Sequence, residues 1–88
     1  MIAYVLINTN PEVIDEVLEL VKKIDNITEA YAVHGLYDII AKIEAETVDR
    51  LKNTVTWKIR QLNDVRSAFI LIAKENIHSS KNFYFVPA

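Results

Sequence analysis

The order of the hydrophobic patterns constrains this chain more than any other feature of its sequence. Six segments carry a regular apolar pattern, and they lie at residues 2–7, 13–24, 27–33, 38–45, 48–62 and 65–73. Continuous or alternating apolar runs are typical of strands, whereas spacings of three and four are typical of amphipathic helices. The predicted order of elements is therefore β, α, β, β, α, β.

This order predicts an α+β fold of the ferredoxin-like type. Four antiparallel strands then form one sheet, and both helices cover the same face because βαβ crossovers are right-handed. The 88 residues suffice for one domain, which we place at 1–74. We expect 75–88 to be a C-terminal tail. Its aromatic residues 83–85 are either a frayed end or a strand added to a neighbour's sheet edge. The apolar run favours packing, either on this subunit or on a neighbouring one.

Polar residues predict where the two helices begin. Asn10 can act as N-cap with Pro11 at the first helical position, or Thr9 can act as N-cap with Glu12 closing a capping box. Thr47 is predicted to cap the second helix in the same way. The sequence leaves the choice between the first two caps open.

Each predicted helix has one apolar face. In the first helix this face consists of Val13, Ile14, Val17, Leu18, Leu20, Val21 and Ile24. In the second helix it consists of Val48, Leu51, Val55, Ile59 and Leu62. Trp57 lies about 180° from the second stripe and is predicted to face outward. It is either an isolated exposed aromatic residue or an anchor in a subunit contact.

The strands are apolar on both sides, which a sheet with one face in water does not require. In the first strand Ile2, Tyr4 and Leu6 oppose Ala3, Val5 and Ile7, and in the last strand Phe69 and Leu71 oppose Ala68, Ile70 and Ile72. The hydrophobic fraction of 51% is also high for so short a chain. We therefore expect a second copy to pack sheet against sheet, in a two-fold dimer of the dimeric α+β-barrel type.

Composition excludes several classes of function. The absence of cysteine excludes a disulfide scaffold, a thiolate nucleophile and a cysteine zinc site. The net charge of -2, without a basic run, argues against direct nucleic-acid binding. No apolar run reaches the ~18 residues that span a membrane. Residues 1–7 lack the cationic region and the cleavage site of a signal peptide, so we expect a cytoplasmic protein. The single glycine cannot supply a glycine-rich phosphate loop.

Catalytic and metal-binding side chains are scarce. His34 has Asp38 across the turn, but a hydrogen-bonded or solvated turn histidine is the more common arrangement. The acidic residues Glu44, Glu46 and Asp49 suit the positive end of the second helix. We therefore predict no catalytic residue, no metal site and no cofactor.

The turn at 35–38 is the strongest candidate for a binding site. Gly35 permits a positive φ and exposes backbone N–H groups that suit a carboxylate. Asp38 can accept from an ammonium group, and Tyr37 can cover an aliphatic stem while offering a hydroxyl. These groups match a free amino acid at both ends, although the same residues also make an ordinary hairpin turn.

Two stretches resemble the effector domain of the Lrp/AsnC family of regulators, the module called RAM. They are Val33-His34-Gly35-Leu36-Tyr37-Asp38 and Ile59-Arg60-Gln61-Leu62-Asn63-Asp64-Val65, each continuing into an apolar strand. The resemblance covers residues 1 to about 74. It implies dimers that assemble into an octamer or decamer and bind amino-acid effectors between dimers. Carried over by position, it assigns ligand binding to Gly35, Leu36, Tyr37, Asp38, Arg66, Ser67 and Ala68.

The chain departs from the family pattern at two places. Family members often carry Ser-Thr where this chain has Ser67-Ala68, so one hydroxyl is missing. The family's helix-turn-helix domain is not found before residue 1, so the chain resembles a stand-alone effector domain. We therefore expect a module that senses a free amino acid and modulates transcription or metabolism through partners, including full-length Lrp/AsnC regulators. The alternatives are a small dimeric α+β-barrel enzyme of monooxygenase or isomerase type, or a purely structural assembly partner.

Overall fold

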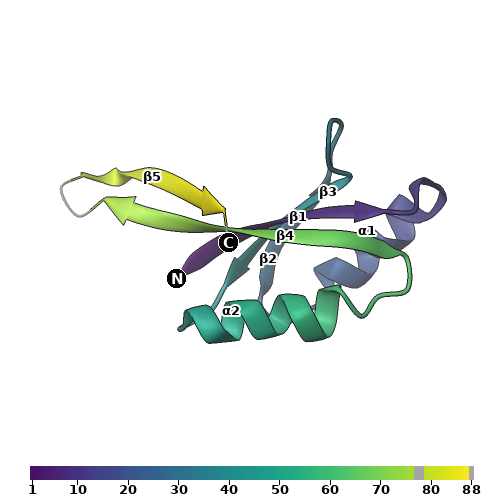
Figure 1. Ribbon diagram of the computed structural model, residues 1–88, viewed down its shortest axis with the longest axis horizontal. Coiled ribbons are helices and arrows are strands. Elements are labelled where there is room, and N and C mark those ends of the chain that lie inside the picture. Colours follow the sequence, from purple (N-terminus) through teal and green to yellow (C-terminus); the bar gives the residue numbers. More distant parts are fainter. Residues whose placement is uncertain (77–78, 88) are drawn as a thin grey trace.

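The computed structural model describes residues 1–76 and 79–87, with side chains described for 1–73. The strands are β1 (Ile2–Thr9), β2 (Ile27–Ala32), β3 (Ile39–Glu44), β4 (Val65–Asn76) and β5 (Ser79–Pro87). The helical segments are η1 (Pro11–Val13), α1 (Ile14–Lys22), α2 (Val48–Thr54) and η2 (Val55–Ile59). The predicted ferredoxin-like order β, α, β, β, α, β is confirmed up to β4 (Figure 1).

The strands form one antiparallel sheet in the order β2-β3-β1-β4-β5. The fifth strand lies in the predicted tail, for which a strand added to a neighbour's sheet edge was one of the alternatives. Its backbone pairs with residues 71–76 of the same chain, which extends β4 beyond the predicted end at residue 73. The resulting β4–β5 hairpin projects from the rest of the molecule (Figure 1). The aromatic side chains at 83–85 lie outside the described side chains.

Both helices cover one face of the sheet, and the core lies between the helices and that face (Figure 1). Along β1 the residues Ala3, Val5, Ile7 and Thr9 are buried, whereas the alternate residues are only half-buried. The helices contribute Val17, Val21, Leu51, Val55 and Ile59 to this core. Leu20, predicted to be buried, is 47% exposed because it lies at the edge of the apolar arc of its helix.

The opposite face of the sheet has no helix on it, and we call it the open face. Its strand positions alternate with the core positions and include Tyr4, Leu6, Tyr31, Ile40, Phe69 and Leu71. Phe69 is 51% exposed and Tyr31 is 56% exposed. The prediction that the strands carry apolar residues on both sides is therefore confirmed.

The helix ends follow the predicted polar residues. The Asn10 side chain accepts from the Glu12 backbone N–H at 3.4 Å, and Pro11 stands at the first helical position. Thr9 is instead the last residue of β1, so the alternative capping box does not form. The predicted cap at Thr47 is confirmed, since its hydroxyl accepts from the Arg50 N–H at 3.1 Å.

The second helix ends in a π-helical turn, η2, that regular spacing did not predict. The Arg60 N–H bonds to the Val55 carbonyl at 2.9 Å, five residues back along the chain. Such a turn is wider than an α-helical one and rotates the residues that follow it. Trp57, within this turn, is 67% exposed as predicted. No helix in the part of the chain that the structure describes is long and apolar enough to cross a membrane.

Candidate functional site

The predicted binding residues 35–38 lie in the connection between β2 and β3, which we call the β2–β3 loop (residues 33–38). Backbone hydrogen bonds close its base, from Val33 N–H to the Asp38 carbonyl at 2.9 Å and from Asp38 N–H to the Ile7 carbonyl at 3.0 Å. The Asp38 carboxylate also accepts from the Thr9 N–H at 2.9 Å. The base of the loop is therefore fastened to the end of β1.

The tip of the loop projects into the solvent. Leu36 is 90% exposed, and Gly35 has a φ of 138°. A Cβ atom at Gly35 would meet no heavy atom within 4 Å, so glycine is needed there for its backbone conformation and not for space. Gly35 is exposed, and the positive φ that the sequence predicted there is confirmed.

Tyr37 is half-buried, unlike its exposed neighbours in the tip. Its ring lies edge-on to the ring of Phe69 on β4, with centroids 6.1 Å apart and planes at 71°. Aromatic pairs prefer this T-shaped arrangement. The contact ties the loop to the open face of the sheet, and sequence reasoning did not identify Phe69 as its partner.

The other predicted residues, Arg66, Ser67 and Ala68, begin β4 on the far side of β1. The Ser67 hydroxyl accepts from the Asn8 side-chain amide at 3.2 Å. Ala68 is 2% exposed with its methyl group in the core, and its carbonyl accepts from the Arg60 guanidinium at 2.7 Å. Arg66 is exposed. The missing hydroxyl noted at Ala68 would therefore have pointed toward the core.

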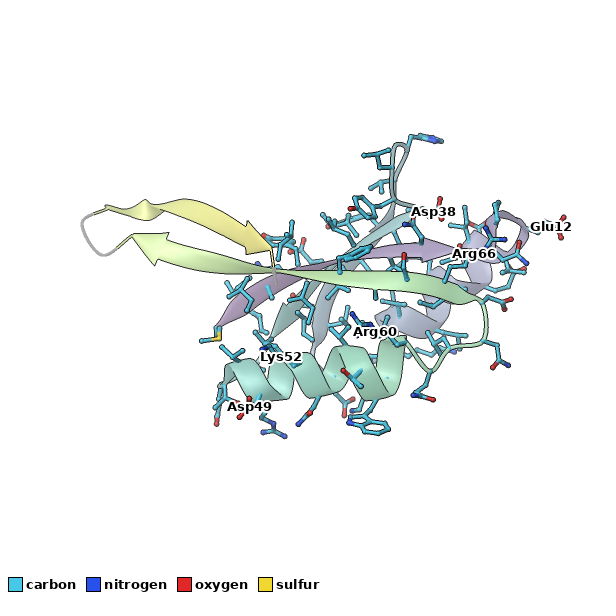
Figure 2. All side chains as sticks on the ribbon, viewed as in Figure 1. Glu12, Asp38, Asp49, Lys52, Arg60 and Arg66 are labelled. Atoms are coloured by element: carbon cyan, nitrogen blue, oxygen red, sulfur yellow. The ribbon has the colours of Figure 1, made fainter. Side chains whose placement is uncertain are left out.

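The structure brings the two predicted groups to one end of the sheet without joining them in one cavity. Ile7 pairs with both Ile39 and Ala68, so β1 lies between them, and Figure 2 shows Asp38 and Arg66 at the same end of the molecule. Sequence reasoning treated Asn8 as part of a strand end and Thr9 as a possible N-cap, and did not connect either of them to the predicted site. Their polar character directly before the turn was the available signal that they hold this end together.

A cleft of about 470 Å³ opens on the helix side of the β2–β3 loop. His34, Gly35 and Asp38 line one wall, and the first residues of η1 and α1 line the other. The opposite wall carries the carboxylates of Glu12 and Asp15. Arg66, Ser67 and Ala68 do not line this cleft. Among the described residues, no three acidic or histidine side chains are placed to hold a metal ion.

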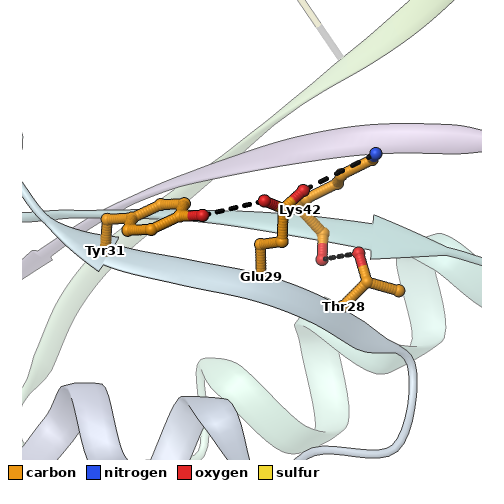
Figure 3. Close-up of polar contacts among 4 residues, drawn as sticks. All are labelled: Thr28, Glu29, Tyr31 and Lys42. Carbon is orange, nitrogen blue, oxygen red and sulfur yellow. Dashed lines mark hydrogen bonds and ion pairs between the residues drawn. The ribbon is translucent and has the colours of Figure 1, made fainter.

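A second polar cluster lies on the open face, at the β2–β3 edge (Figure 3). The Tyr31 hydroxyl donates to the Glu29 carboxylate at 2.8 Å, and the Lys42 ammonium lies 3.7 Å from the other oxygen of that carboxylate. The hydrogen bond to Glu29, and the negative charge of Glu29, raise the pKa of the Tyr31 hydroxyl. The cluster places both signs of charge on the open face.

The family description "Lrp/AsnC ligand binding domain" matches residues 2–83 of this chain. The regulatory protein AsnC of Escherichia coli K12 is 30% identical over 59 residues, which are 67% of this chain and 39% of AsnC. The chain thus spans about two fifths of the length of this relative.

Solved structures share the fold. TTHA0845 from Thermus thermophilus superposes with a TM-score of 0.81 at 28% identity, covering 85% of this chain and 94% of that one. The transcriptional regulator NMB0573 from Neisseria meningitidis superposes with a TM-score of 0.76, covering 91% of this chain and 53% of that one. At 12% identity the second likeness shows the fold alone. The match over residues 2–83 and the shared fold show that this chain belongs to the Lrp/AsnC ligand-binding-domain family.

Proposed function

We propose that this chain is a sensing module whose effector is a free amino acid, and that it acts as a regulator and not as an enzyme. The observation that carries the proposal is the β2–β3 loop, with a base hydrogen-bonded to β1 and an open backbone at Gly35. The solved NMB0573 structure is of a complex with L-Met, which supports an amino acid as the class of effector.

In this proposal the loop binds both charged groups of the amino acid. The backbone N–H groups near Gly35 bind the effector carboxylate, and the Asp38 oxygen that does not accept from Thr9 binds the ammonium group. Leu36 and Tyr37 contact the effector side chain. Because Arg66, Ser67 and Ala68 do not share a cavity with the loop of their own chain, we propose that they form the facing wall from a neighbouring dimer, Ala68 through its backbone because its methyl group is buried.

Calorimetric titration of the chain with each of the twenty amino acids tests this proposal. We expect saturable binding of a small subset and loss of that binding in Asp38→Ala. The matched control is Lys58→Ala, since Lys58 is an exposed residue of η2 away from the loop. If none of the twenty binds to the assembled protein, the effector proposal is wrong.

We also propose that two copies associate through their open faces and that these dimers build an octamer or decamer. The four strands β2, β3, β1 and β4 offer a face of roughly 20 by 25 Å. With protruding side chains, its accessible area is of the order of the ~800 Å² that each partner buries in a standard dimer. A second copy is the fitting occupant because two large exposed rings, Tyr31 and Phe69, lie on a face that also carries both signs of charge, at Glu29 and Lys42.

Light scattering across a range of protein concentrations tests the assembly. We expect eight or ten subunits in the wild-type chain, and smaller species when Leu6→Glu introduces a charge into the open face. The matched control is Lys58→Glu, which places the same charge at an exposed position of η2, away from both the loop and the open face. A wild-type monomer at all concentrations would contradict the proposed assembly.

The role of such a module in the cell depends on its partners. The chain belongs to a family that includes the regulatory protein AsnC. We therefore propose that it works in the cytoplasm and modulates transcription or amino-acid metabolism by joining full-length Lrp/AsnC regulators. Co-purification of the tagged chain with such a regulator, dependent on Leu6 in the open face, is the expected result. Recovery of the same regulator with Leu6→Glu would contradict this route of assembly.

A further inference from the structure

One edge of β4 is open along the first half of the strand. On one side β4 pairs with β1 from Val65 to Ile72, whereas on the other side β5 pairs only with residues 71–76. Within the part of the chain that the structure describes, residues 66–70 have no strand neighbour on this second side, and we call them the free edge. Such an edge presents a row of N–H and C=O groups to which another extended chain can bond.

The carbonyl of Ala68 shows which backbone groups point out of the free edge. It accepts a hydrogen bond from the Arg60 guanidinium at 2.7 Å and therefore points away from β1. The N–H and C=O groups of one strand residue point to the same side, and residues two apart point alike. Ala68 and Ile70 thus both direct their backbone groups outward, where an added strand could bond to them.

A groove of about 210 Å³ lies beside the free edge. Phe69 and Ile70 of β4 line one side, and Lys52, Thr56 and Arg60 line the other. Figure 2 shows Lys52 and Arg60 on the side of the second helix that faces β4. The groove therefore lies in the position that a further strand would take next to residues 68–70.

The π-helical turn η2 aligns the three polar side chains of this groove. Lys52, Thr56 and Arg60 are four residues apart, which is more than the 3.6 residues of each α-helical turn. The turn closed between Val55 and Arg60 is wider, so it compensates for the excess and keeps Arg60 in line with the other two. Turns of this kind are frequent at functional sites.

The groove is positively charged. Lys52 and Arg60 line it, and no acidic residue does. Among the described residues, no carboxylate lies within 4.0 Å of either cation. Arg60 is exposed, so its guanidinium can leave the Ala68 carbonyl and form two parallel hydrogen bonds to an incoming carboxylate.

We propose that the free edge binds an extended segment of a partner protein as an added strand, and that an acidic side chain of this segment binds Lys52 and Arg60. Strand addition supplies main-chain hydrogen bonds, and the neighbouring side chains supply specificity. An N–H group of the segment replaces the Arg60 guanidinium at the Ala68 carbonyl, and the freed guanidinium pairs with the carboxylate. A small carboxylate would use the cations but leave the backbone groups of Ala68 and Ile70 unpaired, so a strand fits this edge better.

The inference goes beyond the proposed function. None of the five residues that line the groove belongs to the proposed effector site. Loss of effector binding would therefore leave this proposal standing, and the reverse also holds.

Fluorescence anisotropy with two synthetic peptides tests the charge contact on the assembled protein. The probe is a labelled, capped heptapeptide of valine and threonine with one central glutamate, and its matched form carries glutamine instead. We expect the wild type to bind the glutamate peptide about three- to tenfold more tightly. Lys52→Gln and Arg60→Gln should each reduce this preference, and the double variant should abolish it.

Two further variants separate charge from fold. Lys58→Gln is the matched control, since Lys58 is an exposed cation of η2 that does not line the groove, and it should keep the full preference. Arg60→Lys keeps the charge and should retain part of the preference. Circular dichroism of each variant checks the fold.

Hydrogen exchange measured by NMR tests the backbone contact. We expect the glutamate peptide to slow exchange of the Ala68 and Ile70 amides, because their N–H groups bond to the added strand. The amides of Ser67 and Phe69 point toward β1 and should change little.

Four results would overturn the proposal. Three concern the wild type: equal affinity for the two peptides, no binding of either peptide, or binding without added protection at Ala68 and Ile70. The fourth is a smaller assembly of Arg60→Gln than of Lys58→Gln in light scattering, which would show that a second copy, and not a partner protein, occupies the free edge.

Discussion

The carboxylate of Asp38 accepts a hydrogen bond from the backbone N–H of Thr9 at 2.9 Å, across 29 residues of sequence. A residue of the β2–β3 loop thereby closes the end of β1. The sequence suggested Asp38 as a ligand for an effector ammonium group, and the structure adds a structural role for one of its two oxygens. The two roles are separable by mutation.

Asp38→Ala removes both the acceptor for Thr9 and the charge proposed to bind the ammonium group. We expect it to lower the free energy of unfolding by about 1–3 kcal/mol, because the Thr9 N–H loses a charged acceptor. Asp38→Asn keeps an oxygen in the same place, so we expect a smaller loss of stability together with the same loss of amino-acid binding. Urea denaturation and calorimetric titration measure the two effects. Equal stability of Asp38→Ala and wild type would contradict the structural role.

Gly35→Ala tests the backbone conformation of the loop tip. No heavy atom lies within 4 Å of the added Cβ, so its cost arises only from the φ of 138°. We expect destabilisation of about 1–3 kcal/mol, measured by urea denaturation. The neighbouring change Leu36→Ala serves as the control and is expected to stay within about 0.5 kcal/mol. Equal effects of the two changes would show that the positive φ carries no cost.

Thr54 provides a buried hydrogen-bonding link between α2 and the segment before β2. Its hydroxyl donates to the Arg50 carbonyl and accepts from the Asn26 side-chain amide, both at 3.0 Å. Thr54→Val keeps the shape but loses both bonds, and we expect a loss of about 1–2 kcal/mol of stability in thermal or urea unfolding. Thr56→Val, at a half-exposed position in the same helical segment, is the control and should change stability by less than about 0.5 kcal/mol.

The Tyr31 hydroxyl is expected to titrate at a pKa above its ordinary value, because it donates to the Glu29 carboxylate and lies in the field of that charge. Glu29→Ala should bring the pKa of Tyr31 back toward the ordinary tyrosine value, as measured by NMR titration of labelled tyrosine rings. Glu44→Ala, on the same sheet face, is the control and should leave the pKa of Tyr31 unchanged. A pKa of Tyr31 unaffected by Glu29→Ala would contradict the hydrogen bond.

The raised pKa of Tyr31 also makes the stability of the fold depend on pH in a definite direction. Since the folded state holds the Tyr31 proton more tightly than the unfolded state, the contribution is fully present below about pH 10 and is lost as the pH rises through the folded pKa. Relative to Glu29→Ala, the wild type should therefore lose more of its stability on passing above about pH 10. Unfolding measured at several pH values between about 8 and 11 checks this direction.

The local patterns of the sequence were sufficient to predict most of the elements and their buried sides. Spacing predicted the four strands and two helices, and alternation predicted that Ala3, Val5 and Ile7 oppose Tyr4 and Leu6. The cap at Thr47 was also predictable, because its bond to Arg50 spans three residues. Leu20 was placed on the wrong side, because spacing alone does not tell where the sheet ends beneath the edge of a helix.

By itself, then, the sequence determined the order of the elements, the apolar character of both sheet faces and the position of the loop glycine, because periodicity and backbone preference act over a few residues. Tertiary structure alone decided that the tail becomes β5, that α2 ends in a π-helical turn and that Asp38 reaches Thr9. It also decided that Tyr37 rests on Phe69 while the Ala68 methyl group points into the core. These features depend on which distant residues the strand register places side by side, and hydrogen-bond partners 29 residues apart leave no periodic trace in the chain.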